Sequence, residues 1–306
     1  MASTSGQLPP GAAHAAVKRE LLVRYLDAAV PVMLHGARRF TYVERSGPQP
    51  AASAALRVFG EFADLFRARR LAVLLVDGAP GALDAVRAEL DDPGWLDVRA
   101  VPEADLVAAL TAAGAKRAPV FAYLDAVGAR ASVPPLTALA ANPHGEALLA
   151  LDGPDAEAGS DAHRAALRRA GFPAVADVEL VDERGARQML LFAAAGDKGL
   201  DRFKNALWAV DEFAGVRYRD PRDREHALLD ISLSPHLGPL RRALVDRVRA
   251  GACSVADLQE YARTETIYRA ADATRALTAL MSAGTLARSP ERGRLTADTQ
   301  IRLAAS

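Results

Sequence analysis

The sequence is poor in cysteine and contains no long hydrophobic run. Its 306 residues include one cysteine, Cys253, which excludes an internal disulfide bond and a metal site built from several thiolates. No apolar segment approaches the roughly 20 residues that a transmembrane helix requires. Residues 1–14 are small and polar, and they lack the basic and apolar regions of a secretion signal. We therefore expect a cytoplasmic protein that begins with a flexible tail over residues 1–14.

The chain also carries no net charge, because 38 lysines and arginines balance 38 aspartates and glutamates. A neutral chain has no overall field that attracts nucleic acid or an anionic membrane, and we expect no membrane partner. Six histidines are spread along the sequence without the spacing of metal ligands, so we expect no metal cofactor. The glycine-rich and serine motifs of P-loop nucleotidases and serine hydrolases are missing as well.

The sequence does contain a regular alternation of helical and strand-like segments. Amphipathic helices are predicted over residues 15–34, 51–69, 83–90 and 105–113. Strands are predicted over residues 40–44, 71–76, 96–101, 119–124 and 146–151. Residues 71–76 form a continuous apolar run, which is typical of a central parallel strand that is covered on both faces. The alternation therefore predicts an α/β fold with a doubly wound parallel sheet.

The pattern changes after the fifth predicted strand. Residues 178–181 and 187–192 flank a turn at residues 182–185, which predicts a β-hairpin, and a helix is predicted over residues 198–210. An antiparallel hairpin at the end of a parallel sheet is the pattern of the methyltransferase-type Rossmann sheet. We therefore predict a Rossmann-like, methyltransferase-type domain over residues 15–233.

Beyond residue 234 the hydrophobic periodicity is helical until the last two short strands. Helices are predicted over residues 240–248, 255–261 and 271–281, and strands over residues 285–288 and 294–296. Three helices followed by a two-stranded wing predict a winged-helix domain over residues 234–306. The candidate contacts with nucleic acid or with a protein partner are its arginines: Arg263, Arg269, Arg275, Arg288, Arg292 and Arg294. Winged helices serve in both roles, and the sequence leaves both open.

Candidate ligand-binding residues follow three of the predicted strands. Ligands of doubly wound sheets bind beyond the carboxyl ends of the strands. If the protein binds S-adenosylmethionine, the loop after the first strand would hold the methionine part and Asp77 would bind the ribose. Asp125, the candidate catalytic residue, would lie near the methyl acceptor. The candidate cofactor-binding residues are Glu44, Ser46, Gly47, Asp77, Asp125 and Gly128. The alternative is that acidic residues end these strands because the chain returns to water there.

The first of these loops is poor in glycine. A cofactor loop needs glycines so that the backbone can approach the ligand closely. Gly47 stands alone in this loop, and Gln49 and Pro50 follow it.

Several segments resemble the three-Cys-motif partner (TcmP) family of bacterial Rossmann-like proteins. Residues 18–26 resemble the first helix of that family, and residues 42–49 resemble its Tyr-x-Asp strand and Ala-Gly-Pro-Gly loop. Residues 124–128 take the place of its Leu-Asp-Pro-Phe-Gly motif. Residues 199–211 resemble its late helix, and residues 261–266 its terminal winged-helix segment. The resemblance implies a Rossmann-like fold and a protein partner that carries a three-cysteine motif.

The departures from the family pattern fall in the site loops. Gln49 replaces the last glycine of the loop, Glu44 replaces the aspartate, and Ala126 and Val127 replace the Pro-Phe pair. The scaffold segments match better, so the sequence favours a binding or partner protein with a degenerate S-adenosylmethionine site. Two alternatives stay open: an active S-adenosylmethionine-dependent methyltransferase of unknown acceptor, and a ligand-sensing regulator that binds nucleic acid. Whether the protein is an enzyme is left open at this point.

Overall fold

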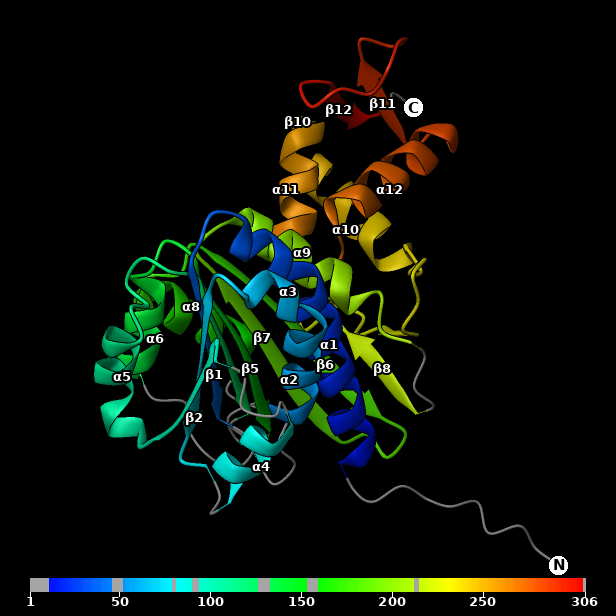
Figure 1. The fold of residues 1–306 in the computed structure, drawn as a ribbon. Coiled ribbons are helices and arrows are strands. Elements are labelled where there is room, and N and C mark those ends of the chain that lie inside the picture. Colours follow the sequence, from blue (N-terminus) through cyan, green and yellow to red (C-terminus); the bar gives the residue numbers. More distant parts are fainter. Residues whose placement is uncertain are drawn as a thin grey trace, which may run out of the picture.

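The computed structural model describes residues 11–45, 52–78, 81–89, 94–125, 133–152, 159–211 and 215–304. Within these ranges nine strands form one mixed sheet in the order β3-β2-β1-β4-β5-β7-β6-β8-β9 (Figure 1). The first five are parallel: β1 (Arg39–Arg45), β2 (Arg70–Val76), β3 (Leu96–Val101), β4 (Val120–Asp125) and β5 (Gly145–Asp152). This confirms the doubly wound sheet that the apolar runs predict.

The antiparallel part of the sheet begins at β7, which pairs with β5 on one side and with β6 on the other. Its strands are β6 (Ala174–Asp182), β7 (Arg187–Ala194), β8 (Val216–Arg219) and β9 (Leu228–Leu229). The hairpin β6–β7 at the end of the parallel strands gives the predicted methyltransferase-type order. Strands β8 and β9 extend the hairpin beyond this prediction.

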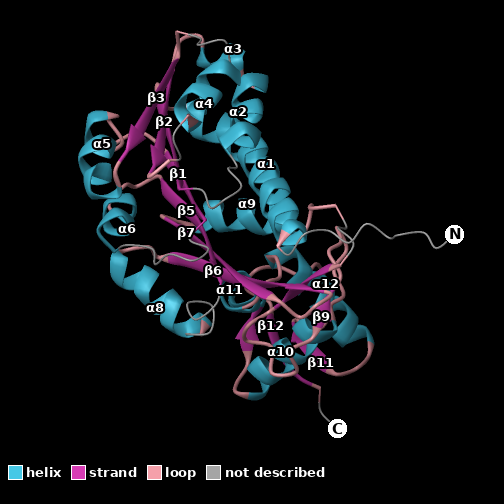
Figure 2. Cartoon of the chain, turned by 90° about the horizontal axis from the view of Figure 1, so that it is seen from below, coloured by secondary structure: helices cyan, strands magenta, loops and turns pink. Residues whose placement is uncertain are grey.

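Helices cover both faces of the sheet (Figure 2). One face carries α1 (Ala12–His35), α2 (Ala52–Glu61), α3 (Ala63–Phe66), α4 (Ala82–Glu89) and α9 (Asp197–Leu207). The other carries α5 (Leu106–Ala112), α6 (Val133–Ala140) and α8 (Ser160–Ala170), and a 3-10 turn, η1 (Glu103–Asp105), precedes α5. Two apolar cores, one on each face, fill these layers. Helix α1 takes in residues 12–14 of the expected tail.

The C-terminal segment is made of three helices and a small antiparallel sheet of order β10-β12-β11. The helices are α10 (Gly238–Arg249), α11 (Val255–Glu265) and α12 (Ala270–Ser282). The strands are β10 (Cys253–Ser254), β11 (Leu286–Ser289) and β12 (Gln300–Leu303), and they lie at the end of the molecule farthest from the large sheet (Figure 1).

The predicted strand at residues 294–296 is wrong, because the last strand is β12. Residues 294–296 lie in the loop between β11 and β12, where Arg294 O accepts a hydrogen bond from the Arg288 guanidinium at 3.2 Å. Ile301, which is fully buried, anchors β12 in the small core. Leu295 is an apolar residue between polar ones because its side chain packs partly against the core from a loop, and not because it belongs to a strand.

Helix α9 fixes the C-terminal segment to the sheet domain. The Lys204 ammonium donates to the carbonyl oxygens of Ala262, Thr266 and Tyr268 at 2.9, 2.6 and 2.8 Å. One turn later, Trp208 Nε1 donates to Ile267 O at 3.0 Å. Residues 199–211 and 261–266 thus contact each other, although Lys204 and Ala262 are 58 residues apart in the sequence.

Candidate functional site

The carboxyl ends of neighbouring strands bring three of the predicted site residues to one edge of the sheet. Strand β1 lies between β2 and β4, so Glu44 at the end of β1 has Leu75 on one side and Tyr123 on the other. Asp77 follows β2 and Asp125 ends β4. The other predicted cofactor residues, Ser46, Gly47 and Gly128, lie outside the described residues.

The Glu44 carboxylate is directed into the protein. Only 1% of the residue is exposed, and the Tyr42 hydroxyl donates to its Oε2 at 2.6 Å. Burial, followed by the negative charge of Glu44, raises the pKa of Tyr42 well above its usual value. Tyr42 therefore keeps its proton and serves as a fixed donor. Since side chains two positions apart on a strand share a face, both groups face the core beneath α1 and α2.

The Asp125 carboxylate is bound by a lysine of α1. Lys18 Nζ lies 2.7 Å from Asp125 Oδ2, with side-chain exposures of 6% and 10% for the two residues. The Tyr123 hydroxyl donates to the same oxygen at 3.3 Å, and burial raises the pKa of Tyr123 well above its usual value. Asp125 Oδ1 is buried without a hydrogen-bond partner among the described residues. The predicted catalytic residue is thus already paired with a buried cation.

Asp77 is exposed and adopts a φ of +47°, which is uncommon for a residue other than glycine. Its Oδ1 accepts a hydrogen bond from Glu103 N at 3.1 Å, so it caps the start of η1. The Glu103 carboxylate in turn pairs with Arg45 at 3.3 Å. Because β2 lies between β1 and β3, this ion pair crosses the carboxyl end of β2 beside Asp77.

The arrangement leaves little free chemistry at this edge of the sheet. Both buried carboxylates accept from donors of the protein itself, and of the three predicted acidic residues that the structure describes only Asp77 has an exposed carboxylate. Four cavities that the described residues line all lie elsewhere, and none of them includes Glu44, Asp77 or Asp125. The described residues contain no group of three or more His, Cys, Asp or Glu side chains placed to hold a metal ion. None of the described helices is both long enough and apolar enough to cross a bilayer.

Three residues that bind the predicted site residues or lie beside them were not predicted from the sequence: Lys18, Arg45 and Glu103. A signal for Lys18 exists, since it lies three, four and seven residues from Leu21, Leu22 and Tyr25 and therefore on the buried face of α1. A lysine on such a face needs a buried counter-charge. Arg45 and Glu103 carry no comparable signal, because their meeting depends on the order of the strands.

The candidate contact arginines of the C-terminal segment are mostly engaged. Arg263 pairs with Asp197, Asp201 and Glu260 at 3.3, 3.1 and 2.7 Å. Arg269 and Arg275 both pair with the buried Asp272 at 2.9 Å. Arg288 donates to carbonyl oxygens of its own loop. Arg292 and Arg294 are exposed in the loop between β11 and β12.

Comparison with known proteins adds structural likeness but no family. No protein-family model and no curated protein matches the sequence. The chain is similar to solved methyltransferase structures. One is the N-terminal domain of EvdMO1 with SAH bound, at 12% identity and a TM-score of 0.35, with 57% of this chain and 81% of that one covered.

Two further similarities are of the same kind. The Haemonchus contortus phosphoethanolamine N-methyltransferase 1 shares 10% identity at a TM-score of 0.38, with 62% of this chain and 45% of that one covered. The Aeropyrum pernix fibrillarin, solved with natively bound S-adenosyl-L-methionine, shares 13% identity at a TM-score of 0.33, over 58% and 76%. At these low values the methyltransferase-like character of the fold rests on the strand order of this chain itself.

Proposed function

We propose that this protein is a binding or partner protein, similar to the three-Cys-motif partner family, built on a methyltransferase-like fold with a degenerate cofactor site. The residues that carry the family resemblance support this, because they bind one another. Lys18 pairs with Asp125, and Glu20 accepts from Asp211 N at 3.0 Å. Tyr25 donates to Glu146, which lies against Gly199. The residues that resemble the family thus form contacts that hold the fold together.

The Lys18–Asp125 ion pair is the observation that carries the proposal. S-adenosylmethionine bears a positively charged sulfonium, and in a methyltransferase the reacting methyl group lies beyond the end of the fourth strand. Lys18 neutralises Asp125, so this ion pair offers a sulfonium no net attraction. Asp125 could attract the sulfonium only after the buried contact with Lys18 is broken, which is costly. The site therefore lacks the free negative charge that would favour the cofactor, and its loop is poor in glycine.

Isothermal titration with S-adenosylmethionine and S-adenosylhomocysteine tests this function. We expect no binding heat from either compound at about 1 mM, a concentration that would reveal even an interaction of roughly −4 kcal/mol. Arg45→Ala removes the Arg45–Glu103 ion pair across β2, and we expect this variant to show no binding heat either. Micromolar binding to the wild-type protein that is lost in Asp77→Ala would instead establish the methyltransferase alternative.

The C-terminal segment is proposed to be a winged helix that docks a protein. The order helix, strand, helix, helix and two further strands, with a three-stranded antiparallel sheet, supports the winged-helix assignment. Arg263, Arg269 and Arg275 are bound to carboxylates. Phosphate contacts would have to displace these partners, so a protein partner is favoured over nucleic acid.

A gel-shift assay with random duplex DNA distinguishes the two kinds of partner. We expect no complex at protein concentrations below roughly 100 μM and physiological salt. Proteins that bind DNA nonspecifically form complexes in that concentration range. A complex that weakens steadily as salt is raised, and that is lost in Arg292→Ala/Arg294→Ala but kept in Arg67→Ala, would support the nucleic-acid-binding regulator instead. Arg67 is a suitable control because it is an exposed arginine of the sheet domain.

A further inference from the structure

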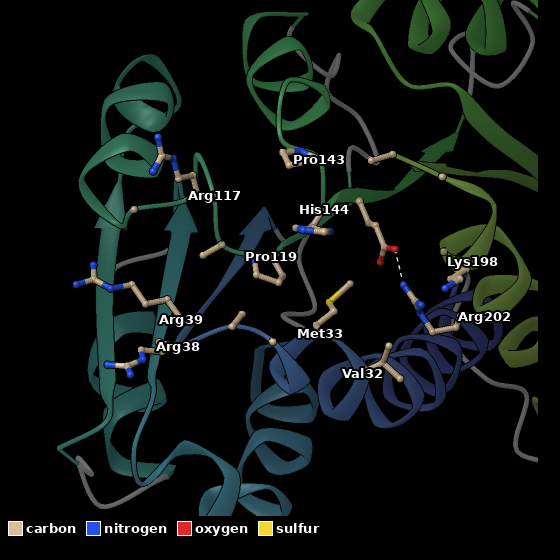
Figure 3. A pocket seen from close by; sticks show the side chains of 18 of the residues that line it. Val32, Met33, Arg38, Arg39, Arg117, Pro119, Pro143, His144, Lys198 and Arg202 are labelled. Atoms are coloured by element: carbon tan, nitrogen blue, oxygen red, sulfur yellow. Dashed lines mark hydrogen bonds and ion pairs between the residues drawn. The ribbon is translucent and has the colours of Figure 1, made fainter.

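A large cavity lies at the edge of the sheet opposite to the candidate site, where the parallel strands begin. Its volume of about 860 Å³ is within the range of small-molecule pockets. The wall is formed by the end of α1, the starts of β1, β4 and β5, and the first turns of α9 (Figure 3). Ligands of parallel sheets normally bind at the other edge, so this cavity is independent of the cofactor question and of the function proposed above.

Positive charge gathers around this cavity although the whole chain is neutral. Its basic lining residues are Arg38, Arg39, Arg117, His144, Lys198 and Arg202. The acidic ones, Glu146 and Asp197, are paired with Arg202 and Arg263 at 2.6 and 3.3 Å. In the described part of the chain, Arg38, Arg39, Arg117 and Lys198 form no ion pair with a carboxylate. The cavity therefore offers uncompensated cations to a ligand.

The position of Lys198 distinguishes this cluster from ordinary surface charge. Basic residues beside α1, α5 and α6 lie near helix C-termini, where cations offset the carbonyl dipoles. Helix α9 is different, because it follows the antiparallel strand β7 and so begins at this edge. Lys198 lies in its first turn, the end of a helix where a cation is unfavourable. A bound anion would reverse this cost and would also meet the amide groups of that turn.

Arg202 supplies a fixed donor in the same wall. Its guanidinium is held by Glu146 Oε1 at 2.6 Å, and the Tyr25 hydroxyl donates to the other oxygen of that carboxylate. A methyl group at Gly199 would collide with this carboxylate, so the close packing needs glycine. Arg202 Nε is buried without a hydrogen-bond acceptor among the described residues.

The rest of the cavity wall is apolar, so the cavity has both a cationic and an apolar surface. Val32, Met33, Pro119 and Pro143 lie between the two groups of cations in Figure 3. Val32 is 58% exposed, a high value for a valine beside a cavity. Such a wall suits the ring or chain of an organic ligand, while the cations suit phosphate. We infer that this cavity binds a small organic phosphate whose apolar part lies against Val32 and Met33.

Titration calorimetry with ADP as the probe tests this site. Arg117→Glu/Lys198→Glu reverses one charge on each side of the cavity, and it is expected to weaken ADP binding at least about tenfold. Arg292→Glu/Arg294→Glu makes the same charge change in the C-terminal segment and is expected to leave the affinity unchanged. Asp77→Ala, at the opposite edge of the sheet, should also leave it unchanged. Pyrophosphate and adenosine should each bind more weakly than ADP.

Four results would overturn the inference. The first is an absence of ADP binding at millimolar concentration, and the second is binding that survives the double charge reversal. The third is equal weakening in the Arg292→Glu/Arg294→Glu control, which would indicate a general charge effect. The fourth is loss of binding in Asp77→Ala, which would place the nucleotide at the candidate cofactor edge and contradict the proposed function as well.

Discussion

Replacing Lys204 by methionine is expected to lower the free energy of unfolding by about 3 kcal/mol or more. The substitution leaves the carbonyl groups of Thr266 and Tyr268 without the Lys204 donor, and each such loss costs roughly 1–3 kcal/mol. Ala262 O also loses its bond to Lys204 but still accepts from the Thr266 hydroxyl at 2.7 Å. Lys204 Nζ also lies at the C-terminal end of α11 and donates to carbonyl groups there. The sheet domain and the C-terminal segment share this contact, so both should lose stability together.

Urea unfolding followed by circular dichroism and tryptophan fluorescence measures this effect. Trp208 is fully buried at the same joint and reports directly on it. Lys198→Met is the matched control, since it removes an exposed lysine of the same helix and should change the stability by less than about 0.5 kcal/mol. A loss below about 1 kcal/mol in Lys204→Met would show that the joint does not depend on the ammonium.

The contribution of Lys204 is expected to depend on pH. Burial, followed by repulsion from Arg222, lowers the pKa of Lys204 from 10.5 to about 7. Between pH 7 and pH 10.5 the unfolded chain therefore holds a proton on Lys204 that the folded protein mostly lacks. The free energy of unfolding rises with pH over this range, so the contribution of Lys204 to it is complete above pH 10.5 and is lost as the pH falls toward 7. The stability difference between the wild type and Lys204→Met should widen from pH 7 to about pH 9, by up to about 1.4 kcal/mol per pH unit. A constant difference would show that the three carbonyls keep the ammonium charged.

Asp177→Ala is expected to destabilise the protein by about 3–5 kcal/mol, because it leaves buried cations without their counter-charge. Asp177 is 1% exposed and accepts from Arg164 and Arg222 at 2.9 and 3.0 Å. Arg222 also bonds to Glu265 at 2.8 Å, and Arg164 bonds to Thr264 O at 2.7 Å. The network thus joins α8 and β6 of the sheet domain to α11 of the C-terminal segment.

Chemical unfolding of Asp177→Ala, Arg164→Met and the double variant measures this coupling. The double variant should lose less stability than the sum of the two single variants, since removing both partners leaves fewer unpaired charges. Amide hydrogen exchange should show reduced protection in α11 of Asp177→Ala. Additive losses, or unchanged protection in α11, would mean that the network does not join the two parts.

The central strands of the sheet could be predicted because strands such as β2, β4 and β5 bury nearly continuous apolar runs. The prediction of residues 71–76 differs from β2 by one residue. Helix α8 could not be found in this way, because two of its four buried residues are Ser160 and Arg164. Hydrophobic periodicity cannot detect a helix that buries an arginine. The short strands β8 and β9 hold too few residues to show an alternation.

The positions of the three predicted acidic residues could be inferred from the sequence, but the partners of their side chains could not. The rule that ligands bind at the carboxyl ends correctly brings Glu44, Asp77 and Asp125 to one edge. Their partners come from elsewhere, and Lys18 is 107 residues away from Asp125. The cationic cavity likewise assembles residues from α1, β1, β5 and α9 and from the segment before β4. Such pairings depend on the packing of distant segments, which a local pattern does not encode.

A crystal structure of the protein grown with about 1 mM S-adenosylmethionine would show whether the site admits the charged cofactor, since a ligand bound by more than roughly 4 kcal/mol would occupy its site at that concentration. We predict that the Lys18–Asp125 and Arg45–Glu103 ion pairs persist and that no nucleoside density lies beside Asp77. Density for an adenosine whose ribose hydroxyls donate to the Asp77 carboxylate, with Lys18 displaced from Asp125, would contradict the account and identify a working cofactor site.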